Sequence, residues 1–168
     1  MQLTRQQPYL RRIAPMLVLV VIAGCGYSLG YQGHPGIVSI AIPMFDNHTF
    51  PLRREIEYDI TRAVRREIQS RTTLSLADSS VSDMTVFGSI REFQERPIAE
   101  GPQDRVIESS LRVEVDLIVE DYQNRKRWKE SVTTTQPFSV QTGETIENAR
   151  SRVIENLAEL IVNTLEAW

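Results

Sequence analysis

The segment from Leu111 to Glu120 limits the fold of this chain more than any other stretch. Its apolar side chains occupy every second position, at Leu111, Val113, Val115, Leu117 and Val119. The positions between them are charged, at Arg112, Glu114, Asp116 and Glu120, with Ile118 as the one exception. Successive side chains of a β-strand point to opposite faces, so the pattern predicts a strand with one buried and one solvated side. A second layer must cover the buried side.

Three further segments, 37–42, 84–91 and 128–140, are rich in residues that favour strands or alternate in polarity. The first is stopped by Pro43. The sequence Gln123-Asn124-Arg125 predicts a hairpin turn between 111–120 and 128–140. A long loop is predicted over 95–104, which contains Pro97, Gly101 and Pro102.

Two amphipathic segments predict the helices of the second layer. The first runs from Pro51, a residue suited to a first helical turn, to Arg71, with apolar residues at Ile56, Ile60, Ala63, Val64 and Ile68. The second runs from about Thr145 to Trp168, and its face is Ile146, Ala149, Val153, Leu157, Leu160, Ile161, Thr164 and Trp168. The order β-α-β-β-β-α predicts an α/β (α+β sandwich) fold. Both helices would pack on one face of a four-stranded mixed sheet, leaving the other face charged and wet.

Two features beside the first helix have more than one interpretation. Its polar face is basic, with Arg53, Arg54, Arg62, Arg65 and Arg66, which fits either contact with anionic lipid or an ordinary solvated surface. Asn47-His48-Thr49 matches a glycosylation sequence, but the Asn and Thr side chains are better explained as shaping the turn into the helix.

The N-terminal residues have the parts of a secretory signal. Arg5, Arg11 and Arg12 provide a basic start, an apolar run from Ile13 to Ile22 follows, and Ala23-Gly24-Cys25 closes it. About ten apolar residues are too few for a membrane-spanning helix. Ile22-Ala23-Gly24-Cys25 resembles the lipobox of bacterial lipoproteins, which implies cleavage before Cys25 and lipid attachment to its sulfur. The alternative is a buried structural thiol; no second cysteine offers a disulfide.

These boundaries divide the chain into a signal peptide at 1–24, a lipidated N-terminus and tether at 25–36, and one periplasmic domain at 37–168. Gly30, Gly33, Pro35 and Gly36 mark the tether. Removing residues 1–24 takes away three arginines and no acids, so the net charge falls from −3 to −6. An acidic domain is poorly suited to binding the phosphate backbone of nucleic acid.

The chain carries no recognisable catalytic or metal-binding motif. His34 and His48 lie in predicted loops without other ligands at metal-binding spacing, and no nucleophile elbow or phosphate-binding loop is present. Asp78, Asp83 and Asp104 are isolated acids near strand ends, best explained as turn formers. We therefore expect a protein that is not an enzyme and needs no cofactor.

Several local sequences resemble the LptE-type lipopolysaccharide-assembly lipoproteins. The resemblance begins at Cys25-Gly26-Tyr27 with Leu29 and continues through Ile37-Val38-Ser39-Ile40-Ala41-Ile42-Pro43-Met44-Phe45-Asp46-Asn47-His48-Thr49. It extends into the helix from Glu57 to Ile68 and the glycine-centred strand from Thr85 to Phe93. It covers most of the mature chain as element order and about forty residues as local motif.

The resemblance implies an outer-membrane lipoprotein that plugs a large β-barrel, assists its assembly and takes part in lipopolysaccharide export. Lipopolysaccharide contacts in such a family involve basic residues and a strand-loop tip. Here Arg125, Lys126 and Arg127 occupy the predicted hairpin tip, and Arg91 and Arg96 lie in or after the predicted strand 84–91. We expect these five to meet lipid A phosphates or acidic groups of the barrel. The alternative is that the tip only keeps a sheet end soluble and discourages edge pairing.

Two other functions fit the same sequence. One is a scaffold or regulatory lipoprotein that binds another periplasmic partner, such as a peptidoglycan synthase, through an exposed strand edge. The other is a ligand-binding or enzymatic periplasmic domain. Co-purification of a barrel protein would separate the first interpretation from both.

Overall fold

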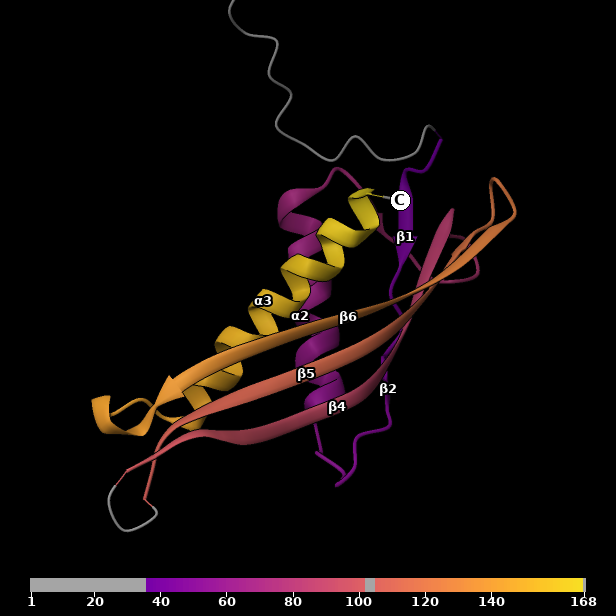
Figure 1. The fold of residues 1–168 in the computed structure, drawn as a ribbon. Helices are drawn as coiled ribbons and strands as arrows, with labels where there is room; N and C mark the ends of the chain where they lie inside the picture. The colour runs from indigo at the N-terminus through magenta and orange to yellow at the C-terminus, as the bar shows by residue number, and fades with distance from the viewer. Residues whose placement is uncertain (1–35, 102–104, 168) are drawn as a thin grey trace, which may run out of the picture.

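The strand predicted from strict alternation is the central strand of the sheet. The computed structural model describes residues 36–101 and 105–167, and the strand is β5 (Arg105–Asp121) (Figure 1). The side chains at 111, 113, 115, 117 and 119 are at most 1% exposed, whereas Arg112, Glu114, Asp116 and Glu120 are half-buried on the other face. The predicted register of β5 is therefore confirmed.

Two long antiparallel neighbours flank β5, namely β4 (Met84–Gly101) and β6 (Lys126–Ser139). Three short strands complete the sheet: β1 (Ser39–Ala41), β2 (Asp46–Asn47) and β3 (Ser75–Leu76). The order is β3-β1-β4-β5-β6, with β2 also pairing to β4, and the short strands all run parallel to their neighbours. The sheet is mixed as predicted, but six-stranded rather than four-stranded.

The predicted loop over 95–104 is wrong for its first part, because β4 continues to Gly101. Pairing with β5 extends over this whole stretch, with register shifts at Pro97/Ala99 and Ala99/Glu100. Proline lacks a backbone N–H, yet it is tolerated in an edge strand or at a bulge. Beyond Ile90, the described residues give β4 no partner strand on its other side, so Pro97 lies in an edge strand beside an irregularity of the ladder.

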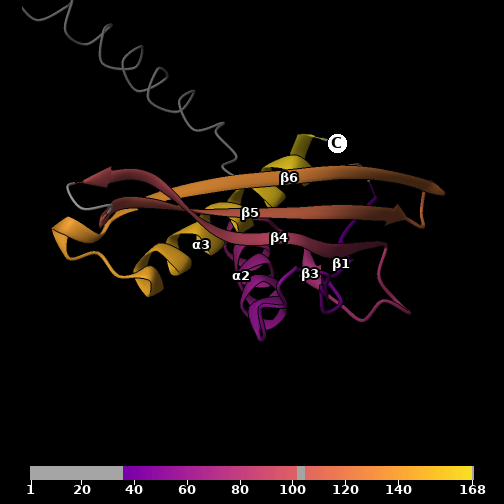
Figure 2. The same cartoon turned by 60° about the horizontal axis from the view of Figure 1, so that its bottom comes forward.

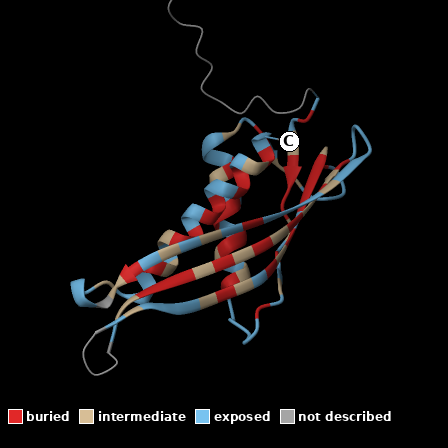
Figure 3. Ribbon diagram, in the orientation of Figure 1, coloured by how far each residue is buried: buried red, intermediate tan, exposed pale blue. Residues whose placement is uncertain are grey.

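Both helices, α2 (Ile56–Arg71) and α3 (Ile146–Ala167), lie on one face of the sheet as predicted (Figure 2). A short 3-10 helix, η2 (Val140–Thr142), connects β6 to α3. The buried sides of both helices turn toward the sheet and toward each other, while their outer sides are exposed (Figure 3). The five apolar residues predicted for the first helix are all buried.

Two details of the predicted helices differ from the structure. Pro51 is not in a first helical turn, because α2 begins at Ile56 and the Phe50–Pro51 peptide, which is cis, belongs to the preceding loop. In α3, Ile146 and Leu160 are 41% and 38% exposed. The buried stripe is instead completed by Ile154, Ala158, Val162 and Leu165, because α2 covers that side of the helix.

The Asn47–Thr49 sequence shapes the loop before α2, as predicted. The Asn47 Oδ1 accepts hydrogen bonds from the Thr49 backbone N–H and hydroxyl, at 3.2 and 2.8 Å. Its Nδ2 donates to the Arg53 carbonyl at 2.7 Å and to Glu57 at 2.8 Å. The Thr49 Oγ1 accepts from the Arg53 N–H at 2.9 Å. These bonds fix where the chain turns toward the helix.

Gly88 allows β4 to pass under a buried aromatic ring. A Cβ atom at this position would lie 2.4 Å from the Phe45 ring, closer than side chains tolerate. Phe45 is 2% exposed, and its backbone N–H donates to the Thr61 hydroxyl of α2 at 3.0 Å. The glycine thus lets the loop before β2 lie directly between the sheet and the helix.

Asp83 joins three parts of the chain at one end of the sheet. Its Oδ2 accepts from the backbone N–H groups of Val38 and Ser39, at 3.0 and 2.9 Å, and from the Ser39 hydroxyl at 2.8 Å. Its Oδ1 accepts from Gln123 in the β5–β6 turn at 2.8 Å. These bonds, led by those from Gln123 and Ser39, lower the pKa of Asp83 to about 2.

We expect Val115→Asp to lower the free energy of unfolding by at least ~3 kcal/mol, because an unpaired charge would enter the apolar layer between β5 and the helices. Glu114→Ala, on the outer face, should cost less than about 1 kcal/mol, as exposed ion pairs do. Urea unfolding of both variants measures the difference. Equal losses would show that the assigned register of β5 is wrong.

The second prediction concerns acid unfolding. The carboxylate of Asp83 has a lowered pKa in the folded protein, so its contribution is complete above the unfolded pKa of about 3.9 and is lost as the pH falls toward about 2. We expect Asp83→Asn to unfold at a lower temperature than the native chain at pH 7. The difference between the two unfolding temperatures should narrow as the pH falls from 4 to 2. Asp78→Asn, an exposed acid in the same loop, is the control and should show no such narrowing.

Candidate functional site

The hairpin tip predicted from Gln123-Asn124-Arg125 is a turn between β5 and β6. Asp121, only 2% exposed, holds the turn by accepting from the Asn124 backbone N–H at 2.9 Å and from its side chain at 2.7 Å. Arg125 has a φ of 52°, in the left-handed region, and tightens the turn. The side chains of Arg125, Lys126 and Arg127 are all exposed there, so the structure brings these three cations together.

Arg127 is the member of this group that has an acidic partner. Its Nε lies 3.3 Å from the Glu120 carboxylate across the β5–β6 ladder. Within the described residues, Arg125 and Lys126 form no ion pair, because the buried Asp121 carboxylate is occupied by Asn124. The tip therefore presents two uncompensated cations and one partly neutralised cation to solvent.

Arg91 and Arg96 do not lie beside the hairpin tip. Both lie on β4, where Arg91 bonds to Asp116 at 2.7 Å and Arg96 to Glu92 at 2.5 Å. Arg96 lies near Ser110 of β5, and the residues from there to Asp121 extend over about 35 Å at the usual rise of a strand. The five predicted site residues thus do not form one patch.

Ion pairs cover the outer face of the sheet. Glu92 bridges Arg96 and Arg112, and Arg112 also reaches Glu114 at 3.3 Å. The bond from Arg91 lowers the pKa of Asp116, and the bond to Glu92 raises the pKa of Arg112. The expected charged outer face is present, but its charges are largely neutralised within the sheet.

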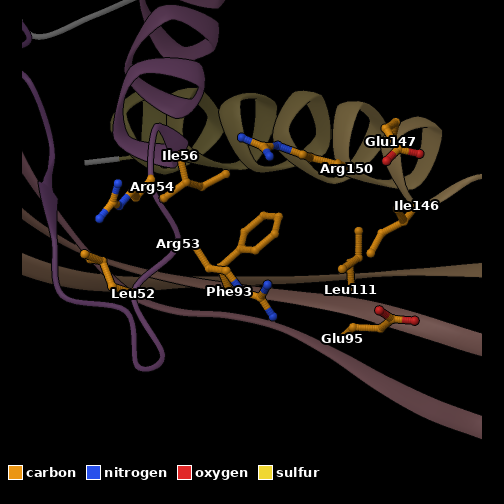
Figure 4. Close-up of a pocket in the computed structure, with 10 residues that line it drawn as sticks. All are labelled: Leu52, Arg53, Arg54, Ile56, Phe93, Glu95, Leu111, Ile146, Glu147 and Arg150. Carbon is orange, nitrogen blue, oxygen red and sulfur yellow. The ribbon is translucent and has the colours of Figure 1, made fainter.

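Sequence patterns gave no indication of the cavity that lies where both helices begin. It has a volume of about 430 Å³ and is lined by Leu52, Arg53, Arg54, Ile56, Phe93, Glu95, Leu111, Ile146, Glu147 and Arg150 (Figure 4). Its floor is apolar, since Phe93, Leu111 and Ile56 belong to the buried core. A hydrogen bond of 3.2 Å from Gln94 to the Phe50 carbonyl holds the loop before α2 beside β4.

Three arginines line this cavity, and their electrostatic environments differ. Arg150 reaches from α3 to Asp59 of α2 at 2.6 Å, and its guanidinium carbon lies 5.9 Å from the centre of the Phe93 ring. The guanidinium groups of Arg53 and Arg54 make neither an ion pair nor a hydrogen bond within the described residues. The sequence placed both on the basic face of the first helix, but they belong to the loop that precedes it.

The remaining chemical expectations concern metals, membranes and the lipid anchor. In residues 36–101 and 105–167, no three His, Cys, Asp or Glu residues are grouped so that they could hold a metal ion. Neither helix in this part of the chain is long and apolar enough to cross a membrane. Cys25, the predicted lipidation site, lies outside the described residues.

Solved structures of other bacterial proteins are similar to this one. A hypothetical protein from Chlamydia trachomatis is similar at a TM-score of 0.56 and 12% identity, covering 77% of this chain and 96% of that one. The rare lipoprotein B of Shewanella oneidensis has a TM-score of 0.51 and 11% identity, covering 73% and 93%. A minor lipoprotein of Acinetobacter baumannii has a TM-score of 0.51 and 14% identity, covering 78% and 92%. At these identities the likeness shows a shared fold.

The family comparison extends over nearly all of the described domain. No curated protein matches the chain significantly. The family model LptE, described as lipopolysaccharide-assembly, matches residues 37–165, from the residues before β1 into the last turn of α3. The chain therefore belongs to the LptE family of lipopolysaccharide-assembly proteins.

Proposed function

We propose that this protein is an outer-membrane lipoprotein that plugs a lipopolysaccharide-export β-barrel, assists its assembly and takes part in lipopolysaccharide transport. Membership of the LptE family over residues 37–165 is the observation that carries the proposal. The scaffold alternative gains no comparable support from the family match.

The outer face of the sheet suits the interior of a barrel. Wide barrels have polar, water-filled interiors, so an inserted domain should present polar groups that need no dehydration. The ion pairs among Glu92, Arg112 and Glu114, together with Arg91 and Asp116, give this face hydrogen-bonding groups and little uncompensated charge. Such a face can remain hydrated in a water-filled lumen. It also has few unpaired charges with which to bind other charged surfaces.

The hairpin tip is the proposed contact with lipopolysaccharide phosphates or with acidic groups of the barrel. Arg125, Lys126 and Arg127 are exposed, although the net charge of the chain is negative. Guanidinium and ammonium groups bind phosphate oxygens through charge-assisted hydrogen bonds. Arg91 and Arg96 already have acidic partners on the sheet, so the proposal rests on the tip.

The lipid anchor completes the proposal. We expect mass spectrometry of the mature native protein to find an acylated cysteine at position 25 as its first residue, since the Ile22-Ala23-Gly24-Cys25 sequence ends a signal-like segment. Cys25→Ser should accumulate as an uncleaved precursor. An unmodified Cys25 in the native protein would contradict the anchor while leaving the family assignment intact.

The barrel and the tip can be tested in one experiment with two readouts. The tagged lipoprotein is purified in mild detergent, co-purifying barrel protein is identified, and binding to purified lipopolysaccharide is measured at low and high salt. We expect a heat-modifiable barrel protein to co-purify. Replacing Arg125, Lys126 and Arg127 by Ser should keep the barrel but weaken lipopolysaccharide binding, most strongly at low salt, where exposed charges are least screened.

The control variant is Arg62→Ser with Arg66→Ser, which removes two exposed cations from α2. Arg65 is kept, because its guanidinium group donates to the Ile42 carbonyl. The control variant should bind lipopolysaccharide as the native protein does. Equal binding by the tip variant at low ionic strength would show that the tip is only a solubilising turn. A peptidoglycan synthase in place of a barrel among the co-purifying proteins would favour the scaffold function.

A further inference from the structure

We propose that the cavity at the start of α2 and α3 binds a single-headed acidic amphiphile, with an alkyl chain and one phosphate or carboxylate group. The guanidinium groups of Arg53 and Arg54 point to different sides in Figure 4, and the head would lie between them, with the alkyl chain over Phe93 and Leu111. The cavity lies toward the opposite end of the domain from the hairpin tip, since Leu111 and Asp121 are separated by most of β5. This proposal therefore goes beyond the proposed function and does not depend on it.

The size and floor of the cavity fit an alkyl chain. Its volume of about 430 Å³ falls within the range of roughly 300–1,000 Å³ that is common for small-molecule sites. Phe93, Leu111 and Ile56 form the floor, and none of them carries a polar side-chain atom. Each methylene group that moves from water onto such a surface strengthens the binding of the chain.

Apolar side chains are also exposed to water at the opening of the cavity. Of the residues that line the cavity, Leu52 is 61% exposed and Ile146 is 41% exposed. An alkyl chain would cover part of this exposed apolar surface, so binding would remove it from water.

The two uncompensated arginines define the charge of the head. Arg53 and Arg54 have no acidic partner within the described residues, although the net charge of the chain is negative. A phosphate or carboxylate would supply the missing partner through charge-assisted hydrogen bonds.

The acids of the cavity explain why one head group is expected and not two. Glu95 and Glu147 lie toward the Ile146 side of the cavity in Figure 4, Leu52 and Arg54 lie on the other side, and the guanidinium group of Arg53 lies between them. A ligand with a second anionic group at the far end of its chain would meet these carboxylates and be repelled. Arg150 does not relieve this repulsion, because its guanidinium is directed to Asp59 of α2.

The test uses the full native chain in nanodiscs of zwitterionic lipid and an alkyl phosphate with a photoactivatable diazirine at the end of its chain. After illumination, labelled peptides are identified by mass spectrometry. We expect labels in the segments 50–56, 93–95 and 146–150. Octyl phosphate should compete for labelling, whereas inorganic phosphate, octanol and octane-1,8-diyl bisphosphate should compete at least about tenfold more weakly.

Separate variants test the contact with the head group and the contact with the alkyl chain. Arg53→Gln with Arg54→Gln should reduce labelling about tenfold, and Leu52→Ser should weaken competition by octyl phosphate without affecting that by inorganic phosphate. Matched controls are Arg62→Gln with Arg66→Gln, exposed on α2 after the loop that carries Arg53 and Arg54, and Leu160→Ser, exposed on α3 beyond the cavity. Thermal unfolding followed by circular dichroism checks that each variant is folded.

Several results would overturn the proposal. Equal competition by inorganic phosphate would mean a simple anion site, and equal competition by octanol would mean an apolar hollow without head recognition. Labels outside the three segments, or an equal loss of labelling in the Arg62 and Arg66 control, would place binding elsewhere. None of these outcomes bears on lipopolysaccharide binding at the hairpin tip, which is measured with its own variant.

Discussion

The structure depends on the contact between the apolar row of β5 and the two helices. Val113, Val115 and Leu117 are fully buried, and the apolar stripes of α2 and α3 close over them. Because side chains of a strand alternate, burying this row places Arg112, Glu114 and Asp116 on the opposite face without further cost in backbone conformation. The packed side and the polar side of the domain are therefore two results of one interaction, and both would change together if the register slipped by one residue.

Patterns with a repeated period could be predicted from the sequence, and features formed by contacts between distant residues could not. The alternation at 111–119 and the helical spacing from Ile56 to Ile68 gave β5 and α2, and both were correct in their buried residues. The short strands β2 and β3 have only two residues each, too few to show any period. Proline and glycine led to a predicted loop at 95–104, but pairing with β5 outweighed local preference. The cavity is formed by residues from a loop, two strands and two helices, so no single segment could indicate it.

Charge has different roles on three parts of the surface. On the outer sheet face, Arg91, Arg96 and Arg112 are matched with acids, which makes that face polar and close to neutral. At the hairpin tip and beside the cavity, Arg125, Lys126, Arg53 and Arg54 have no such acids among the described residues. The basic residues were conspicuous in the sequence, but only the structure separates those already neutralised from those still available to a partner.

The Asp83 bonds have a mechanical consequence if the domain is anchored through its N-terminal residues, as we propose. The chain reaches the domain at Gly36 and enters the sheet at β1, which lies between β3 and β4 and not at an outer edge. A pull on the preceding residues would load the hydrogen bonds of β1 along the strand direction, so that several must break together. Asp83 shares this load with the turn between β5 and β6, because it bonds to Val38, Ser39 and Gln123. Tension applied to the residues before β1 would thus reach the basic hairpin directly, and the Asp83 bonds would resist separation of β1 from the sheet.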